Sequence, residues 1–268
     1  MSQINNPLGI YKLLPKSNCK LCGVATCLAF AAEIIKGQKR LDECPHLESH
    51  IIEELDVKII RQTTPEEQLK QILVPLKREI ATIDFSASVQ RLGATLAGDK
   101  LTIKILGKDF TIDSEGNMMS ACHNNVWVMV PLLNYIISSA GKDLSGKWIP
   151  FRELSNGIVW SAFFEKMFEK PLKQLIDAYS DLIEDMIHIF RGKPEETSFD
   201  SDISLVLYPL PKVPMLICYT KPEEDIESKL NVFFDTSAED NLKIDSIYRL
   251  CVGLLVMFHK ITSMHIKP

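Results

Sequence analysis

The sequence lacks any apolar run long enough to span a lipid bilayer. The longest, LCVGLLVMF at residues 250–258, is far shorter than the about 20 residues that a transmembrane helix needs. The N-terminal stretch MSQINNPLGIYKLLPK contains no apolar segment of the kind found in signal peptides. These absences predict a cytoplasmic protein that neither enters nor binds a membrane.

Motifs of several large enzyme classes are also missing. The chain has no P-loop, no G-x-G-x-x-G, no HExxH and no nucleophile motif, which argues against an ATP-driven activator. It has no internal repeat and no low-complexity segment. The net charge of −5 argues against a general nucleic-acid surface. With 268 residues, 24% of them charged, the chain fits one or two globular domains.

Cysteine is rare after residue 44 and concentrated before it. Four clustered thiols in a cytoplasmic protein indicate metal ligands rather than disulfides. The chain divides near RQTTPEEQ, residues 61–68, which predicts a four-cysteine domain at 1–62 and a second domain at 63–268. The clustered cysteines are Cys19, Cys22, Cys27 and Cys44, and the scattered ones are Cys122, Cys218 and Cys251.

Hydrophobic periodicity predicts an α+β fold, with a small, mostly helical first domain and an antiparallel sheet in the second. The predicted hairpin surrounds Gly107, and three later strands follow residue 202. The predicted helices are 26–37, with Thr26 as cap and Gly37 as end, 65–81, 125–141, one or two helices over 157–190 broken at Pro171, and 240–262.

The spacing of the clustered cysteines suits a cubane iron–sulfur cluster. Two residues separate Cys19 from Cys22, four separate Cys22 from Cys27, and sixteen separate Cys27 from Cys44. A C-x-x-C turn, a helix start and a distant Cys-Pro can bring four thiolates to one centre. Gly23 permits a positive φ, so that backbone amides can approach the cluster sulfurs.

A tetrahedral zinc site made by the same four thiolates is the alternative. Zinc ribbons usually carry two C-x-x-C knuckles, and the second pair is missing here. His46 is an alternative ligand, although a solvent-facing histidine after a turn is the simpler interpretation.

The first domain resembles the N-terminal iron–sulfur domain of the corrinoid iron–sulfur protein large subunit, the acetyl-CoA decarbonylase/synthase gamma subunit. The matching pattern is IYKLLP at residues 10–15, then C-x-x-C-G-x-x-x-C, then Cys44-Pro45. The resemblance implies a 4Fe-4S cluster held by Cys19, Cys22, Cys27 and Cys44. It ends there: the remaining chain is too short for that family's barrel and cobalamin domains, and no D-x-H-x-x-G motif occurs.

The second domain resembles a family of uncharacterised domains often fused to this iron–sulfur module. The marks are GKWIPFREL at 146–154, PLPKVPM at 209–215 and NVFFDTSAEDNL at 231–242. This resemblance implies no activity, so whether the protein is an enzyme stays open.

Outside the cluster, Cys122 and His123 form the most reactive-looking pair. Thiolate and imidazole are good ligands for a haem iron or a cobalt corrinoid, so the pair is a candidate second cofactor site. A buried cysteine beside a helix-capping histidine is the simpler alternative. The aromatic residues between 148 and 168 could stack on a flat cofactor, although an ordinary core explains them as well.

These observations favour a 4Fe-4S electron-transfer protein of anaerobic metabolism, linked to corrinoid or one-carbon chemistry. The expected partner is a redox protein, such as a corrinoid protein or methyltransferase, and Lys12, Lys16 and Lys20 could guide its docking. Two alternatives stay open. The second domain could bind or deliver a corrinoid or other tetrapyrrole, or the cluster could be structural or oxygen-sensing.

Overall fold

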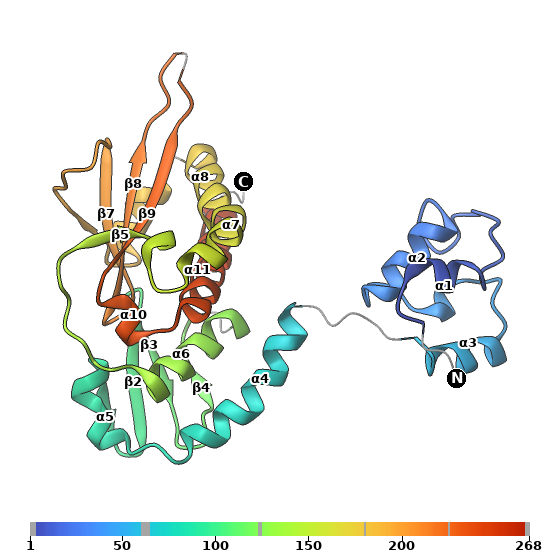
Figure 1. Ribbon diagram of the computed structural model, residues 1–268, viewed down its shortest axis with the longest axis horizontal. Helices are drawn as coiled ribbons and strands as arrows, with labels where there is room; N and C mark the ends of the chain where they lie inside the picture. Colours follow the sequence, from blue (N-terminus) through green and yellow to red (C-terminus); the bar gives the residue numbers. More distant parts are fainter. Residues whose placement is uncertain (1–3, 60–64, 123–124, 180, 225, 266–268) are drawn as a thin grey trace. The chain divides into compact units, whose positions relative to one another are not determined.

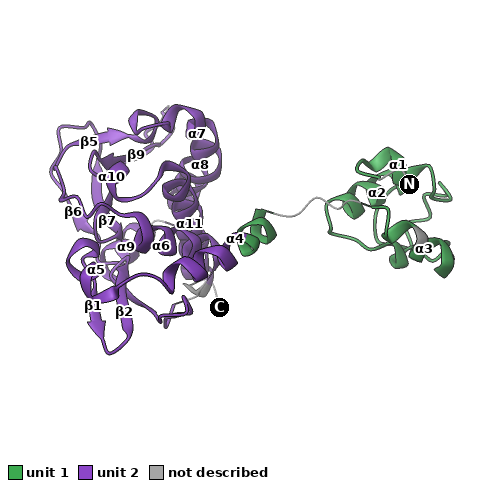
Figure 2. Ribbon diagram, turned by 60° about the horizontal axis from the view of Figure 1, so that its bottom comes forward, with its two compact units in different colours: residues 1–71 green, residues 72–268 purple. Residues whose placement is uncertain are grey.

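Two compact units make up the computed structural model, which describes residues 4–59, 65–122, 125–179, 181–224 and 226–265. The units comprise residues 1–71 and 72–268 (Figure 2). The domain boundary expected after residue 62 lies outside the described residues and stays a prediction. Within the described ranges, every helix is too short or too polar to cross a membrane.

Short helices around a small apolar core form the first unit. At the centre of the core lie Ile10, Phe30 and Leu41, each at most 1% exposed. A parallel bridge joins Ile4 to Ile59 and connects the start of the unit to the segment after residue 56. The elements are α1 (Pro7–Tyr11), α2 (Cys27–Ile35), the 3-10 turn η1 (Leu41–Glu43) and α3 (Ser49–Asp56) (Figure 1).

Helix α2 begins and ends as its sequence predicts. Thr26 caps it, because its Oγ1 accepts a hydrogen bond from the Ala29 N–H at 3.1 Å. Gly37 follows with a φ of +72°, a left-handed conformation that glycine adopts at helix ends at little steric cost. The cap fixes where Cys27, the first residue of α2, leaves the preceding loop.

Two antiparallel sheets organise the second unit. Their strand orders are β1-β2-β3-β4 and β5-β9-β8-β7-β6, which confirms the predicted α+β class. The strands are β1 (Thr95–Ala97), β2 (Lys100–Ile105), β3 (Lys108–Ile112), β4 (Met118–Met119), β5 (Trp148–Pro150), β6 (Lys193–Pro194), β7 (Ile203–Leu210), β8 (Val213–Thr220) and β9 (Lys229–Asp235).

The predicted hairpin at Gly107 is confirmed and connects the two sheets. Leu106 and Gly107 form its two-residue turn with φ values of +48° and +72°, the left-handed pair that a tight hairpin favours. The Leu106 N–H donates to the carbonyl of Tyr208 in β7 at 2.9 Å. The turn of one sheet is therefore fixed against the neighbouring sheet.

Helices α7, α8 and α11 lie along one side of the five-stranded sheet (Figure 1). Strand β8 is buried on both faces, and its Leu216 and Cys218 are covered on the side away from the main core by Phe199 and Phe233. Helix α4 (Pro65–Ile80) contains residues of both units. The helical elements of the second unit are α5 (Phe85–Leu92), α6 (Val126–Ser138), η2 (Phe151–Glu153), α7 (Gly157–Phe164), the π-turn η3 (Glu165–Glu169), α8 (Lys170–Ala178), α9 (Leu182–His188), α10 (Ala238–Asn241) and α11 (Ile244–His265).

Two predicted helix ends are wrong. Pro171 does not break the chain, because it occupies the first turn of α8, where its missing N–H is tolerated, directly after the π-turn η3. The helical path ends instead at Tyr179, whose φ of −133° is extended. Helix α6 ends at Ser138 rather than Gly141, since the Ala140 N–H already donates to the carbonyl of Asp240.

Candidate metal centre

The loop between α1 and α2 carries the first two clustered cysteines on an unusual backbone. Lys16, Asn18 and Lys20 have φ values of +59°, +49° and +64°, and Gly23 has +77°. Left-handed conformations disfavour side chains with a Cβ and persist where the surrounding structure imposes them, often at functional sites. Turns of this kind direct successive N–H groups to one side, which favours binding of negatively charged groups.

Asn18 closes this loop onto the start of α2. Its side-chain Oδ1 accepts the Cys27 N–H at 2.8 Å, and its own N–H donates to Cys27 Sγ at 3.4 Å. Cys27 is the first residue of α2, at the positive end of the helix dipole. The Cys27 sulfur is therefore held by an amide donor at a helix N-terminus.

Cys19 and Cys22 lie in more polar surroundings. Hydrogen bonds from the Leu21 N–H and the Ser17 hydroxyl lower the pKa of Cys19, which is exposed. Cys22 is half-buried, and Lys39 lies near it: a Cβ added at Gly23 would be 3.9 Å from Lys39 Nζ. The donors at Cys19 thus favour its ionised thiolate, the form that binds metals, and Lys39 adds a positive charge near Cys22.

Cys44 belongs to the same small core as Cys27. Both side chains are buried, at 6% and 8% exposure, and Cys22 packs against this cluster from its edge. Cys44 follows η1, and its N–H donates to the carbonyl of Leu41 at 3.1 Å. Three of the four predicted ligands thus belong to one core, whereas Cys19 is exposed.

The chemistry of the four clustered cysteines fits a metal centre. All four thiols are free, and amide donors already point at two of the sulfurs. Within the described residues, no three His, Cys, Asp or Glu side chains are grouped closely enough to hold a metal ion. Ligation by Cys19, Cys22, Cys27 and Cys44 therefore stays a prediction. His46 is exposed, as the simpler interpretation expects.

Of the predicted pair Cys122 and His123, only Cys122 belongs to the described residues. His123 lies outside the described residues. Cys122 is half-buried, its N–H donates to Ser120 Oγ at 3.1 Å, and it lines a mainly apolar cavity of about 220 Å³. The pairing of Cys122 with His123 stays a prediction.

The aromatic section is divided between the core and the surface. Phe151, Phe164 and Phe168 are at most 3% exposed, and the rings of Phe151 and Phe164 stack at 4.0 Å. Phe163 is 58% exposed. The buried rings thus contribute to an ordinary core.

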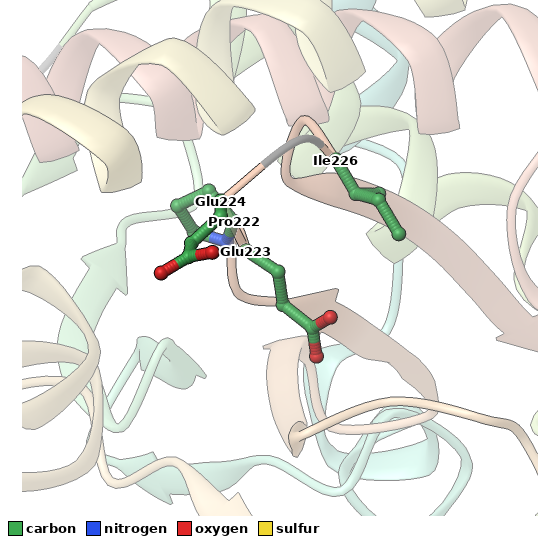
Figure 3. A pocket seen from close by; sticks show the side chains of 4 residues that line it. All are labelled: Pro222, Glu223, Glu224 and Ile226. Atoms are coloured by element: carbon green, nitrogen blue, oxygen red, sulfur yellow. The ribbon is translucent and has the colours of Figure 1, made fainter.

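A wide hollow lies at the β8–β9 loop. It measures about 660 Å³ and is lined by Pro222, Glu223, Glu224 and Ile226. Figure 3 shows the carboxylates of Glu223 and Glu224 pointing in different directions. They do not converge on a common ligand position.

Residues from the three motifs that mark the second domain (146–154, 209–215 and 231–242) surround the loop at residues 139–147. Asp235 accepts hydrogen bonds from the N–H groups of Ser145, Gly146 and Ser237 at 2.7–3.0 Å. Burial alone would raise the pKa of Asp235, but hydrogen bonds led by those from Ser237 and Ser145 outweigh it and lower the pKa. The Asp235 carboxylate thus fixes the course of this loop.

Lys212 and Asn241 also bond to this loop. Together with Asp235 they form the hub, the set of polar side chains that holds residues 139–147. Lys212 Nζ donates to the carbonyl of Gly141 at 2.6 Å and to the carboxylate of Asp143 at 2.9 Å. The Asn241 amide bonds to both the N–H and the carbonyl of Lys142, at 2.8 and 2.9 Å. Residues from the three motifs therefore stabilise the loop at residues 139–147.

Comparison with known proteins identifies a two-part chain, an iron–sulfur segment joined to an uncharacterised domain. Residues 14–46, which contain all four clustered cysteines, match the family described as "Putative Fe-S cluster". Residues 84–257 match the family described as "Domain of unknown function (DUF3786)". Because that match covers more than half of the chain, the protein belongs to the DUF3786 family.

Curated relatives match the N-terminal part. The chain is 43% identical over 58 residues to the acetyl-CoA decarbonylase/synthase complex subunit gamma of Methanocaldococcus jannaschii. The matched segment covers 22% of this chain and 12% of that protein. It is 51% identical over 49 residues to the corrinoid/iron-sulfur protein large subunit of Moorella thermoacetica, 18% of this chain and 11% of that protein.

A third relative extends the match. The subunit gamma 2 of the same complex in Methanosarcina thermophila is 38% identical over 91 residues, 34% of this chain and 17% of that protein. The chain thus spans less than a fifth of the length of these three relatives. No solved structure matches this chain.

Proposed function

We propose that the first unit binds a 4Fe-4S cluster through Cys19, Cys22, Cys27 and Cys44 and serves in single-electron transfer. The observation that carries the proposal is the match of residues 14–46 to an iron–sulfur family, a segment that includes all four cysteines. Such a cluster, when bound, supplies a one-electron redox couple.

The surroundings of the cysteines support this role. N–H donors at the sulfurs stabilise the negative charge of an all-thiolate cluster, and such hydrogen bonds help to set its potential. Asn18 donates to Cys27, and Leu21 donates to Cys19. Lys39 adds a positive charge near Cys22, and the hydrogen bond to Glu43 raises the pKa of Lys39. Lys39 therefore stays protonated.

The exposure of part of the proposed cluster site suits electron transfer to a protein partner. Cys19 is exposed and Leu21 is 68% exposed, so an electron would have a short path to a docked partner. Lys12, Lys16 and Lys20 are also exposed and would attract an acidic surface. Because the relatives are corrinoid and acetyl-CoA decarbonylase/synthase proteins, the proposed partner is a corrinoid protein or methyltransferase of anaerobic one-carbon metabolism.

Anaerobic metal analysis tests the cluster. We expect about four iron and four sulfide per chain with little zinc, a broad visible absorption shoulder, and a paramagnetic signal on reduction. Cys27→Ser and Cys44→Ser should lose most of the iron, because each removes one thiolate. Cys218→Ser is the matched control, since Cys218 is a buried cysteine of β8, and it should retain the iron. Stoichiometric zinc in anaerobically purified protein would contradict the proposal.

The same spectra separate the alternatives. Sharp tetrapyrrole bands would favour the corrinoid-binding hypothesis for the second unit, a hypothesis that the N-terminal relatives do not address. A cluster that cannot be reduced at any accessible potential would favour a structural or sensing role.

A further inference from the structure

A cationic cavity of about 300 Å³ lies where the two sheets of the second unit meet. The hydrogen bond from the Leu106 N–H to the carbonyl of Tyr208 joins the sheets at this point. Side chains reach the cavity from β2, from β6 and β7, and from the segment between α9 and β6. The lining includes Lys104, Phe190, Arg191, Lys193 and Tyr208.

The charge of this cavity differs in sign from that of the chain. Among the described residues, three cationic side chains line it and no acidic one does, although the protein has 35 acidic and 30 basic residues. Lys104 is neutralised by Asp109 at 2.5 Å. Lys193 Nζ lies 5.4 Å from the centre of the Tyr208 ring, and within the described part of the chain no carboxylate pairs with it or with Arg191. Two cations thus remain without a counter-charge.

The backbone holds Arg191 in a conformation that its side chain disfavours. Its φ is +54°, and the next N–H, that of Gly192, donates to the carbonyl of Met186 at 2.9 Å. The Arg191 side chain lies across Gly107, since a Cβ added there would be 2.7 Å from Arg191 Cδ. Strain of this kind is retained where the fold imposes it, and it is concentrated at functional sites.

We propose that this cavity binds a small organic anion. Its carboxylate or phosphate group is held by Arg191 and Lys193, because the planar guanidinium matches two oxygens of either group. Its apolar or ring portion lies against Phe190 and Tyr208. A volume of about 300 Å³ is at the lower end of ligand pockets, so the ligand is compact. This proposal does not depend on the iron–sulfur assignment.

Calorimetric titration of the full-length protein at constant ionic strength tests the proposal. The probes are phenyl phosphate and benzoate, which combine an anionic group with a ring, inorganic phosphate, which lacks the ring, and phenol, which lacks the charge. We expect one equivalent of phenyl phosphate or benzoate to bind, at least about tenfold tighter than either inorganic phosphate or phenol. The better of the two ring anions identifies the anionic group.

Two variants and a control locate the binding. Arg191→Asn removes the charge, and asparagine tolerates the left-handed backbone. Lys193→Met removes the second charge from an exposed position. Each should weaken binding at least about tenfold. Lys229→Met, an equivalent change at the exposed start of β9, should leave binding unchanged. If Arg191→Asn does not fold, Lys193→Met alone decides. Binding no tighter than about 10 mM for every probe, or unchanged affinity in the folded cavity variants, overturns the proposal.

Discussion

Replacing Asn241 by Ala tests whether the hub around residues 139–147 stabilises the second unit. Asn241 is 1% exposed. Its Oδ1 accepts the Lys142 N–H at 2.8 Å and the Ser139 hydroxyl at 3.1 Å. Its Nδ2 donates to the carbonyls of Lys142 and Lys212 at 2.9 and 3.0 Å. One buried amide thus connects three chain segments.

The magnitude follows from the groups that lose this partner. Asn241→Ala leaves the buried Ser139 hydroxyl and the carbonyl of half-buried Lys212 without the amide, and a polar group left unsatisfied on burial costs about 1–3 kcal/mol. Two such groups predict a loss of about 3 kcal/mol in the free energy of unfolding. For a unit of this size, the same loss lowers Tm by about 6–12 °C.

Urea unfolding followed by tryptophan fluorescence measures this loss. The three tryptophans are Trp127, Trp148 and Trp160, all in the second unit, so the signal reports on that unit alone. Asn117→Ala is the control, because Asn117 is exposed, and it should cost less than about 1 kcal/mol. A comparably small effect of Asn241→Ala would refute the structural role of the hub.

Two further predictions concern pH and the division of the chain. Burial raises the pKa of Glu169 to about 7 from its ordinary 4.5. The folded unit therefore binds more protons than the unfolded chain in this range, and its stability should fall as pH rises from 4.5 to about 7. Glu169→Gln retains an acceptor for the Val232 N–H and should flatten this slope in urea midpoints, whereas an equal slope would contradict the assignment. We also propose that the second domain, from about residue 63, folds without iron, so Cys27→Ser should leave the tryptophan-monitored unfolding midpoint unchanged; a lowered midpoint would show that the units depend on each other.

Local signals predicted those parts of the fold whose determinants are adjacent in sequence. The cap at Thr26 and the stop at Gly37 define α2, because both act through backbone groups within one helical turn. The hairpin at Gly107 followed from alternating residues around a turn glycine. The four-cysteine pattern is equally local, since all of its members lie within 26 residues.

Features that depend on distant segments were not predicted. A proline normally ends a helix, and only the π-turn before Pro171 shows why the helical path continues to Ala178. The cationic cavity was missed because Lys104 and Arg191 are 87 positions apart (191 − 104). Individually, each has the sequence context of a solvated surface residue, and only the contact between the two sheets brings them together.

The pairing of polar side chains distinguishes the hub from the cavity. The Asp235 carboxylate accepts hydrogen bonds from N–H and hydroxyl groups of its own chain, which leaves little capacity to accept a bond from a ligand. Replacing Asp235 should therefore affect folding. Within the described residues, Arg191 has no carboxylate partner despite its fixed backbone, so an anion can bind there without displacing an internal bond. A buried charge needs polar partners, and the fold supplies them to Asp235 as N–H and hydroxyl donors, whereas Arg191 is exposed and can take an anion as its partner. Sequence marks such as FFDTS therefore indicate the stability of this domain, whereas the unpaired cations indicate where a ligand would bind.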